Sequence, residues 1–208
     1  MPTLYTMPGT CSLAPNIAVA WLDAPVEIHN IAYGDHKKES YLKINPKGKV
    51  PALRFEDGDT LTEASAILSW LGAAYGTDAY ARNTVLGRKE AEALSYMTSE
   101  VHAAYGGHFG PGNFADSDAA QDEVKRKTYE NLNGHYKLLD EHLKANGGEW
   151  YLGKRSFADA FLYVLTRWLE QTPLSIDDYS ALKKFRAHME ADEGVQKALK
   201  RQDMEPIG

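Results

Sequence analysis

The sequence predicts an α/β domain at the N-terminus, followed by a second domain that is built from helices alone. Two short β-prone runs flank a helical stretch near the N-terminus, which is the pattern of a βαβ unit. Two further strand candidates flank Asp57-Gly58, a typical hairpin turn, and a helix comes after them. From residue 84 onwards only helical periodicity is found. We therefore expect domains at 1–77 and 84–208, with the aperiodic segment 76–83 as a linker.

The elements of the first domain follow from alternation and from turn residues. Residues 3–6 are β-prone and end at Pro8-Gly9, and residues 26–31 alternate with a period of two. The predicted strands are 3–6, 26–31, 50–55 and 60–62, and the predicted helices are 12–22 and 63–74. The order βαβ and then ββα implies a sheet that begins parallel and ends antiparallel.

The second domain is predicted from helical spacing and from helix breakers. Its helices are expected at 85–105, 118–144, 156–170, 180–192 and 194–200. Gly106-Gly107 is expected to end the first of these helices. Ser156 and Asp159 have the spacing of a capping box, in which each side chain satisfies a backbone N–H of the first turn.

Composition excludes several classes of protein. With 23 basic and 29 acidic residues the net charge is −6, which argues against nucleic-acid binding. No apolar run approaches the ~20 residues that span a bilayer, and the N-terminus does not resemble a signal peptide. A single cysteine among the 208 residues cannot form an intrachain disulfide, and the histidines lack metal-ligand spacing. We expect a cytoplasmic protein with no metal and no membrane partner.

Cys11 lies just after the Pro8-Gly9 turn, at the start of a predicted helix. The partial positive charge of a helix N-terminus favours thiolate, so we expect a lowered pKa and a reactive sulfur. A small buried hydrophobic residue explains an isolated cysteine about equally well. Without a second cysteine, any redox cycle would need a thiol from another molecule.

Two further features of the first domain suggest a ligand site. Val50-Pro51 opens a strand, either as an edge strand or as a cis peptide that turns the Val50 backbone toward an extended ligand. Glu63-Ala64-Ser65 begins a helix, where Glu63 could simply complement the helix dipole. Alternatively, the free N–H groups there could hold a ligand carboxylate while Glu63 takes an amine.

In the second domain, Ser95, Ser99 and His102 are spaced i, i+4 and i+7, so a regular helix would present them on one face. A solvated polar face is the ordinary explanation of such a triplet. A role for His102 in chemistry would require this face to lie near the thiol.

Five segments, taken together, resemble the cytosolic glutathione S-transferases, and most closely the bacterial beta class. They are Pro8–Leu13, Asn45–Leu53, Leu61–Ile67, Ser99–His102 and Phe157–Ala160. The resemblance covers nearly the whole chain, with the change of domain between the third and fourth segments. It implies a thioredoxin-like N-terminal domain that holds glutathione and a helical bundle domain that shapes the site of a second substrate.

The resemblance also assigns residues. Cys11 matches the beta-class cysteine that contacts the glutathione sulfur, and His102 matches a histidine that reaches the same atom; both are expected to be catalytic. The glutathione-binding residues that it implies are Cys11, Lys37, Val50, Pro51, Glu63, Ala64, Ser65, Ser95, Ser99 and His102. Lys38 matches nearly as well as Lys37. The family tyrosine is displaced by one residue, to Tyr5, and a shift of one residue in a strand turns a side chain to the opposite face, so Tyr5 receives no role.

The resemblance implies an enzyme that conjugates the glutathione thiol to small apolar electrophiles, in a pocket beside Tyr105, His108 and Phe109. It also implies a homodimer. Two alternatives remain: a glutathione-dependent thiol–disulfide reductase with a monothiol cycle at Cys11, and a non-catalytic carrier of apolar ligands. The intact set of expected glutathione contacts argues against the carrier.

Overall fold

The computed structural model describes residues 1–76 and 84–208 and divides into two compact units. Unit 1 contains Met1–Ala91 together with Met189–Gly208, and unit 2 contains Glu92–His188. The C-terminal segment therefore packs with the N-terminal residues, which the pattern along the chain did not indicate. Most of the expected linker, residues 77–83, lies outside the described residues.

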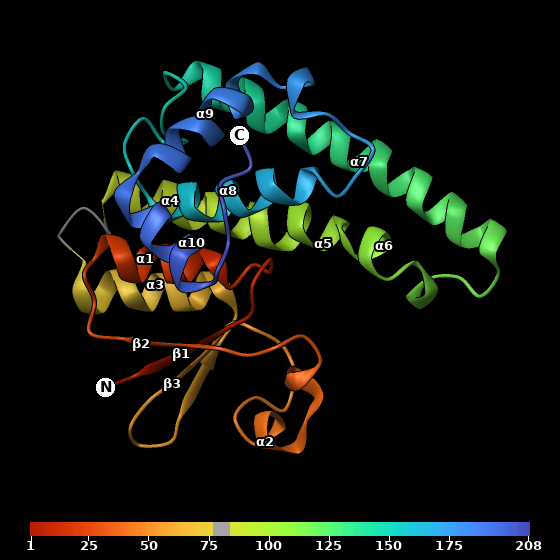
Figure 1. Ribbon diagram of the computed structural model, residues 1–208. Coiled ribbons are helices and arrows are strands. Elements are labelled where there is room, and N and C mark those ends of the chain that lie inside the picture. The colour runs from red at the N-terminus through yellow and green to blue at the C-terminus, as the bar shows by residue number, and fades with distance from the viewer. Residues whose placement is uncertain (77–83) are drawn as a thin grey trace. The chain divides into compact units, whose positions relative to one another are not determined.

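Unit 1 is built around a mixed sheet of four strands in the order β2-β1-β3-β4 (Figure 1). The strands are β1 (Thr3–Thr6), β2 (Glu27–Asn30), β3 (Ala52–Arg54) and β4 (Thr60–Thr62). β1 pairs in parallel with β2, whereas the β1–β3 and β3–β4 pairs are antiparallel. The expected parallel beginning and antiparallel end of the sheet are confirmed, and the unit has the thioredoxin-like fold.

Helices cover both faces of this sheet. α1 (Leu13–Trp21) and α3 (Ala64–Tyr75) pack together on one face, and the short α2 (Glu39–Leu42) lies on the other (Figure 1). The Tyr5 ring contacts the ring of Tyr41 on α2, at 5.9 Å between centroids, so Tyr5 faces away from α1. α10 (Glu193–Arg201) packs along α1 and brings the C-terminal segment into this unit.

The first long helix of the second domain is not regular. α4 (Val85–Tyr96) continues as a π-helical turn over Met97–Val101 and then as α5 (His102–Ala104). The remaining helices up to α10 are α6 (Gly106–Phe109), α7 (Asp118–Ala145), α8 (Phe157–Leu169) and α9 (Ser180–Ala191). All of the long helices expected from the sequence are present.

The helix ends before Gly106-Gly107 as expected, since α5 stops at Ala104, but a new short helix, α6, begins at Gly106. A Cβ atom on Gly107 would lie 2.1 Å from Oγ1 of Thr128 on α7. Gly107 thus permits a close approach of α6 and α7, so this glycine also serves helix packing.

The expected capping box at the start of α8 is confirmed. The Asp159 carboxylate accepts hydrogen bonds from the Ser156 backbone N–H at 2.7 Å and from the Tyr151 N–H at 2.6 Å. Because Asp159 is fully buried, these bonds hold a charged group that would otherwise be costly to remove from water. Among the helices that the structure describes, none combines the length and the apolar character that a membrane span requires.

Candidate active site

The loop that carries Cys11 is held by short hydrogen bonds between its own residues. Ser12 Oγ accepts from the Met7 backbone N–H at 2.9 Å and shares a hydrogen bond with Thr10 Oγ1 at 2.7 Å. Thr10 Oγ1 also donates to the Met7 carbonyl at 2.8 Å. These contacts fix the turn between β1 and α1, so the position of Cys11 is determined within six residues.

The expectation of a lowered Cys11 pKa is wrong. Burial raises the pKa of the thiol to about 12, and the nearby Glu63 carboxylate adds to this, while the backbone hydrogen bond and Lys49 act in the opposite direction. The desolvation cost of a thiolate therefore exceeds the stabilisation available at the start of α1. The residue as a whole is only partly buried, and its Sγ lies 3.7 Å from the Val50 carbonyl, to which the thiol donates.

The peptide bond between Val50 and Pro51 is cis, which was one of the two expected alternatives. The segment before it is anchored at the Lys49 carbonyl, which accepts from Tyr41 Oη and from Asn45 Nδ2, both at 2.7 Å. Val50 is half-buried against the cluster formed by Met7, Ile31, Tyr41 and Ala52. Val50 and Cys11 thus meet beyond the ends of the two central strands, since Cys11 follows β1 and Val50 precedes β3.

Lys37 and Lys38 make different contacts. Lys37 Nζ donates to the Gly48 carbonyl at 3.3 Å, whereas Lys38 Nζ pairs with Asp35 at 2.6 Å. Gly48 has a φ of +58°, and a Cβ there would lie 3.0 Å from the His36 carbonyl, so the close approach favours glycine. Lys37 is therefore the lysine beside the segment that leads to Val50.

Glu63 stands at the N-cap position of α3 with a φ of +70°, a conformation that is rare for residues other than glycine. Its carboxylate is exposed and pairs with Lys47 Nζ at 2.8 Å, and the same ammonium donates to Thr62 Oγ1 at 3.0 Å. The Glu63 side chain does not cap the start of α3, so the first N–H groups, those of Ala64 and Ser65 among them, form a site suited to an anion.

Sequence reasoning missed Lys47. It lies in the expected turn cluster Asn45–Lys49, where a lysine gives no particular signal, and only the folded chain brings it to Glu63. The exposed pair is worth little to stability, but it supplies the counter-charge of the carboxylate when no ligand amine is present.

In unit 2, the π-helical turn over Met97–Val101 adds a residue to the helix between Ser95 and His102. His102 therefore does not share a helix face with Ser95 and Ser99, contrary to the expectation from the i, i+4, i+7 spacing. Ser95 and Ser99 are exposed, and Ser99 Oγ donates to the Ser95 carbonyl at 2.8 Å. His102 comes after the extra residue of the turn and is half-buried, with its ring 5.0 Å from that of Trp168 and 5.9 Å from that of Phe161. The two serines and the histidine therefore have different surroundings. Such turns are frequent at functional sites.

The three residues expected beside a second substrate belong to an aromatic cluster in unit 2. Tyr105, Phe109 and Trp168 lie within 5.2 to 5.6 Å of one another, measured between ring centroids. Phe109 is 53% exposed, whereas Tyr105 is buried. Trp168 was not singled out in the sequence, although it lies seven residues after Phe161 and therefore on the same side of a helix.

The hydroxyl groups of this cluster are engaged within the protein. Tyr136 Oη donates to the Leu165 carbonyl at 2.7 Å, so the Tyr105 hydroxyl, 2.6 Å away, donates to Tyr136. Burial raises the pKa of Tyr105 well above its usual value, so it stays protonated at neutral pH. His108 Nδ1 contacts Tyr129 Oη at 3.0 Å, and burial lowers the pKa of His108. The cluster therefore offers apolar ring surface rather than reactive hydroxyls.

Within residues 1–76 and 84–208, no group of three or more histidine, cysteine or carboxylate side chains is arranged to hold a metal ion. The site residues of unit 1 fall into a thiol beside a backbone carbonyl, a carboxylate at a helix start and a lysine. These groups match a peptide-like ligand that has an amine, a carboxylate and a sulfur.

Comparison with known proteins identifies the family of both parts. The glutathione S-transferase N-terminal domain family matches residues 4–79, and the glutathione S-transferase C-terminal domain family matches residues 108–202. Glutathione S-transferase GST-4.5 of Xanthomonas campestris is 32% identical over 203 residues, which cover 94% of this chain and 96% of the relative. GstA of Escherichia coli O157:H7 is 28% identical over 202 residues, or 94% of this chain and 96% of that protein.

Solved structures give the same result for the fold. A glutathione S-transferase from Xylella fastidiosa superposes with a TM-score of 0.89 at 31% identity, covering 99% of this chain and 100% of the other. A sphingomonad glutathione S-transferase in complex with glutathione gives 0.85 at 31% identity, with 98% and 100% covered. A bacterial beta class enzyme from Sphingomonas chungbukensis gives 0.84 at 29% identity, with the same coverage. The chain belongs to the glutathione S-transferase family.

Proposed function

We propose that this enzyme conjugates the thiol of glutathione to small apolar electrophiles. The observation that carries the proposal is the grouping, in unit 1, of the Cys11 thiol, the Val50 carbonyl and the Glu63 carboxylate. A sphingomonad relative of 31% identity has been solved in complex with glutathione. A ligand carrier without chemistry would not need this set of polar groups.

Glutathione has a charged or polar group for each polar feature of unit 1. Glu63 takes the α-ammonium group, and the N–H groups of Ala64 and Ser65 take the α-carboxylate at the start of α3. The backbone of Val50, before Pro51, pairs with the cysteinyl residue, and Lys37 supplies a positive charge for the remaining carboxylate. Ligand binding displaces the Lys47 ammonium from Glu63.

Cys11 acts as a hydrogen-bond donor rather than as a nucleophile. Because the pKa of its thiol is raised to about 12, Cys11 stays protonated at neutral pH and can donate to the glutathione thiolate. The glutathione sulfur then attacks the electrophilic carbon, and the leaving group departs with the bonding electrons. A reductase cycle would require the Cys11 thiolate, so the raised pKa favours conjugation.

The residues of unit 2 complete the proposal. His102 stabilises the glutathione thiolate as a hydrogen-bond donor, and Ser95 and Ser99 supply further polar contacts. The rings of Tyr105, His108 and Phe109 provide apolar surface for the electrophile. We further propose that the enzyme is a homodimer in the cytoplasm and that it needs no metal.

Calorimetry with glutathione tests the binding step. Glu63→Ala should weaken binding by ~10- to 150-fold, which corresponds to ~1.5–3 kcal/mol for a hydrogen bond to a charged group. Glu56→Ala is the matched control, since Glu56 is an exposed carboxylate of unit 1 that pairs with the N-terminus. Unchanged affinity in Glu63→Ala would refute the assigned roles.

A panel of electrophiles and disulfides, assayed with glutathione, tests the reaction class. Conjugation of apolar electrophiles that persists in Cys11→Ala supports the proposal. If the purified enzyme instead has one glutathione attached to Cys11 by a reducible bond, and reduces disulfides faster than it conjugates, the reductase alternative is correct.

A further inference from the structure

The segment after α10 contacts the loop that carries Cys11. The backbone N–H of Gly9 donates a hydrogen bond to Met204 Sδ at 3.3 Å, over 195 residues of sequence. Gly9 lies two residues before Cys11, within the turn that positions the thiol. Met204 therefore joins the C-terminal segment directly to this loop.

The C-terminal segment is fixed on both sides of Met204. Before it, Asn16 on α1 donates through Nδ2 to the Ala198 carbonyl at 3.3 Å and accepts through Oδ1 from Arg201 at 3.2 Å. After it, the N–H groups of Ile207 and Gly208 donate to the Glu190 carboxylate at 2.9 and 3.1 Å. A change in the Met204 side chain is therefore transmitted to the Gly9 loop, because the backbone of the segment cannot follow it freely.

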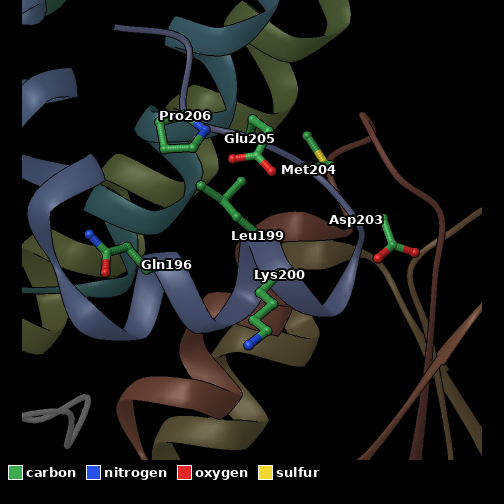
Figure 2. A pocket seen from close by; sticks show the side chains of 7 residues that line it. All are labelled: Gln196, Leu199, Lys200, Asp203, Met204, Glu205 and Pro206. Carbon is green, nitrogen blue, oxygen red and sulfur yellow. The ribbon is translucent and has the colours of Figure 1, made fainter.

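Met204 also lines a hollow of about 410 Å³ on unit 1. The residues around the hollow are Gln196, Leu199, Lys200, Asp203, Met204, Glu205 and Pro206 (Figure 2). In Figure 2 the Met204 side chain leaves the tail just beyond α10, near Glu205. The thioether is thus beside a space that is large enough for a small polar oxidant.

The other methionines provide an internal comparison. Of the five methionines, Met7, Met97 and Met189 are at most 9% exposed, whereas Met204 is half-buried. Met1 is 61% exposed, but it is the terminal residue, and its amino group pairs with Glu56. Met204 is therefore the accessible methionine that touches the active-site loop.

We propose that Met204 is an oxidation site, and that its conversion to the sulfoxide by hydrogen peroxide breaks the hydrogen bond by which the C-terminal segment holds the Gly9 N–H of the Cys11 loop. The thioether sulfur gains one oxygen atom and loses two electrons, and the peroxide is reduced to water. The sulfoxide is larger and more polar, and its sulfur carries a partial positive charge. That sulfur can no longer accept the Gly9 N–H, and the new oxygen, which lies one bond away from the position of the sulfur, can accept it only if the loop or the segment moves.

Cys11 does not compete effectively for the oxidant. Peroxide reacts with thiolate rather than thiol, and the buried Cys11 thiol is protonated at neutral pH. A thioether has no proton to lose, so its oxidation does not depend on pH in this way. The first oxidation near the site is therefore expected at the sulfur of Met204.

The effect on catalysis rests on the proposed function, but the structural effect does not. Once the Gly9 N–H no longer donates to Met204 Sδ, the turn at residues 7–12 keeps its own hydrogen bonds and loses this hydrogen bond to the C-terminal segment. We expect faster amide exchange at Gly9 and in residues 202–206, and a two- to tenfold loss of glutathione conjugation.

The experiment treats the full-length enzyme with dilute hydrogen peroxide and measures oxidation of each methionine by peptide mass spectrometry. Met204 and Met1 should oxidise at least tenfold faster than Met7, Met97 and Met189. Hydrogen–deuterium exchange of the same samples reports on Gly9 and residues 202–206, and conjugation is measured in parallel. Met204→Leu, which keeps a similar volume without an oxidisable sulfur, is compared with its own untreated sample.

Each outcome decides the proposal. Faster exchange at Gly9 that accompanies Met204 oxidation in the parent enzyme, and is absent from treated Met204→Leu, supports it. Met204 oxidation at the rate of the buried methionines would overturn it, as would equal changes in exchange in Met204→Leu. If exchange responds as expected but no conjugation is found in the untreated enzyme, the oxidation site stands and the proposed function fails.

Discussion

The Cys11 loop is held by residues close to it in the sequence, whereas the His102 side chain is held by residues far along the chain. Met7, Thr10 and Ser12 fix the turn around Cys11 with hydrogen bonds between residues at most five positions apart. His102 packs on Phe161 and Trp168, which lie about sixty residues further along the chain. A local motif can therefore be recognised from its residues, whereas the surroundings of His102 exist only once α8 has packed.

The largest effect is expected from Asp159→Ala, which removes the buried cap at the start of α8, the helix on which His102 packs. The change removes the acceptor of the Tyr151 and Ser156 N–H groups and leaves buried donors without a partner. We expect a loss of ~3–5 kcal/mol in the free energy of unfolding, measured in urea. Asp118→Ala, an exposed carboxylate in the first turn of α7, is the control and should cost ~1 kcal/mol or less. Similar losses in both variants would contradict the role of the buried cap.

The second test concerns the buried thiol of unit 1. Because the pKa of Cys11 is raised to about 12, its alkylation by iodoacetamide should become about tenfold faster per pH unit up to pH 10 and beyond. At pH 8 the folded enzyme should react some tens of times more slowly than the same chain unfolded in urea, whose thiol has a pKa of ~8.5. A plateau in the rate near pH 8 would show that the helix N-terminus prevails over burial.

His102→Ala tests whether His102, whose surroundings come from distant parts of the chain, takes part in the reaction. A contact that stabilises negative charge matters most where that charge is greatest, so turnover should fall about tenfold while the dissociation constant of glutathione changes less than ~3-fold. His135→Ala is the matched control, since His135 is a histidine of unit 2 whose Nδ1 contacts Tyr96 Oη at 2.8 Å. Equal effects on turnover in the two variants would reduce His102 to a packing residue.

The smallest expected effect separates two adjacent lysines. Lys37→Ala should weaken glutathione binding by ~3-fold, because Lys37 lies beside the segment that leads to Val50. Lys38→Ala removes only an exposed pair with Asp35, and should change the affinity by less than ~2-fold. A larger effect at Lys38, measured by calorimetry, would reverse the assignment.

The sequence by itself predicted the elements and the local motifs. Strand alternation, the Asp57-Gly58 turn and the Ser156–Asp159 spacing depend on neighbours within a few residues, so they can be read without the fold. The glutathione S-transferase family was recognised in the same way, from five short segments in order. These features are encoded locally because turn and capping geometry is set by the residues that form it.

Tertiary structure decided the features that depend on burial or on distant partners. The helix start predicted a lowered Cys11 pKa, but the packing around the thiol raises it, since desolvation depends on every atom that excludes water. Because of the π-helical turn, the His102 ring packs on Trp168 and lies on a different face of the helix from Ser95 and Ser99. Lys47 reached Glu63, and Met204 reached Gly9, only through the fold. Such contacts join residues far apart in the sequence, and no periodicity along the chain records them.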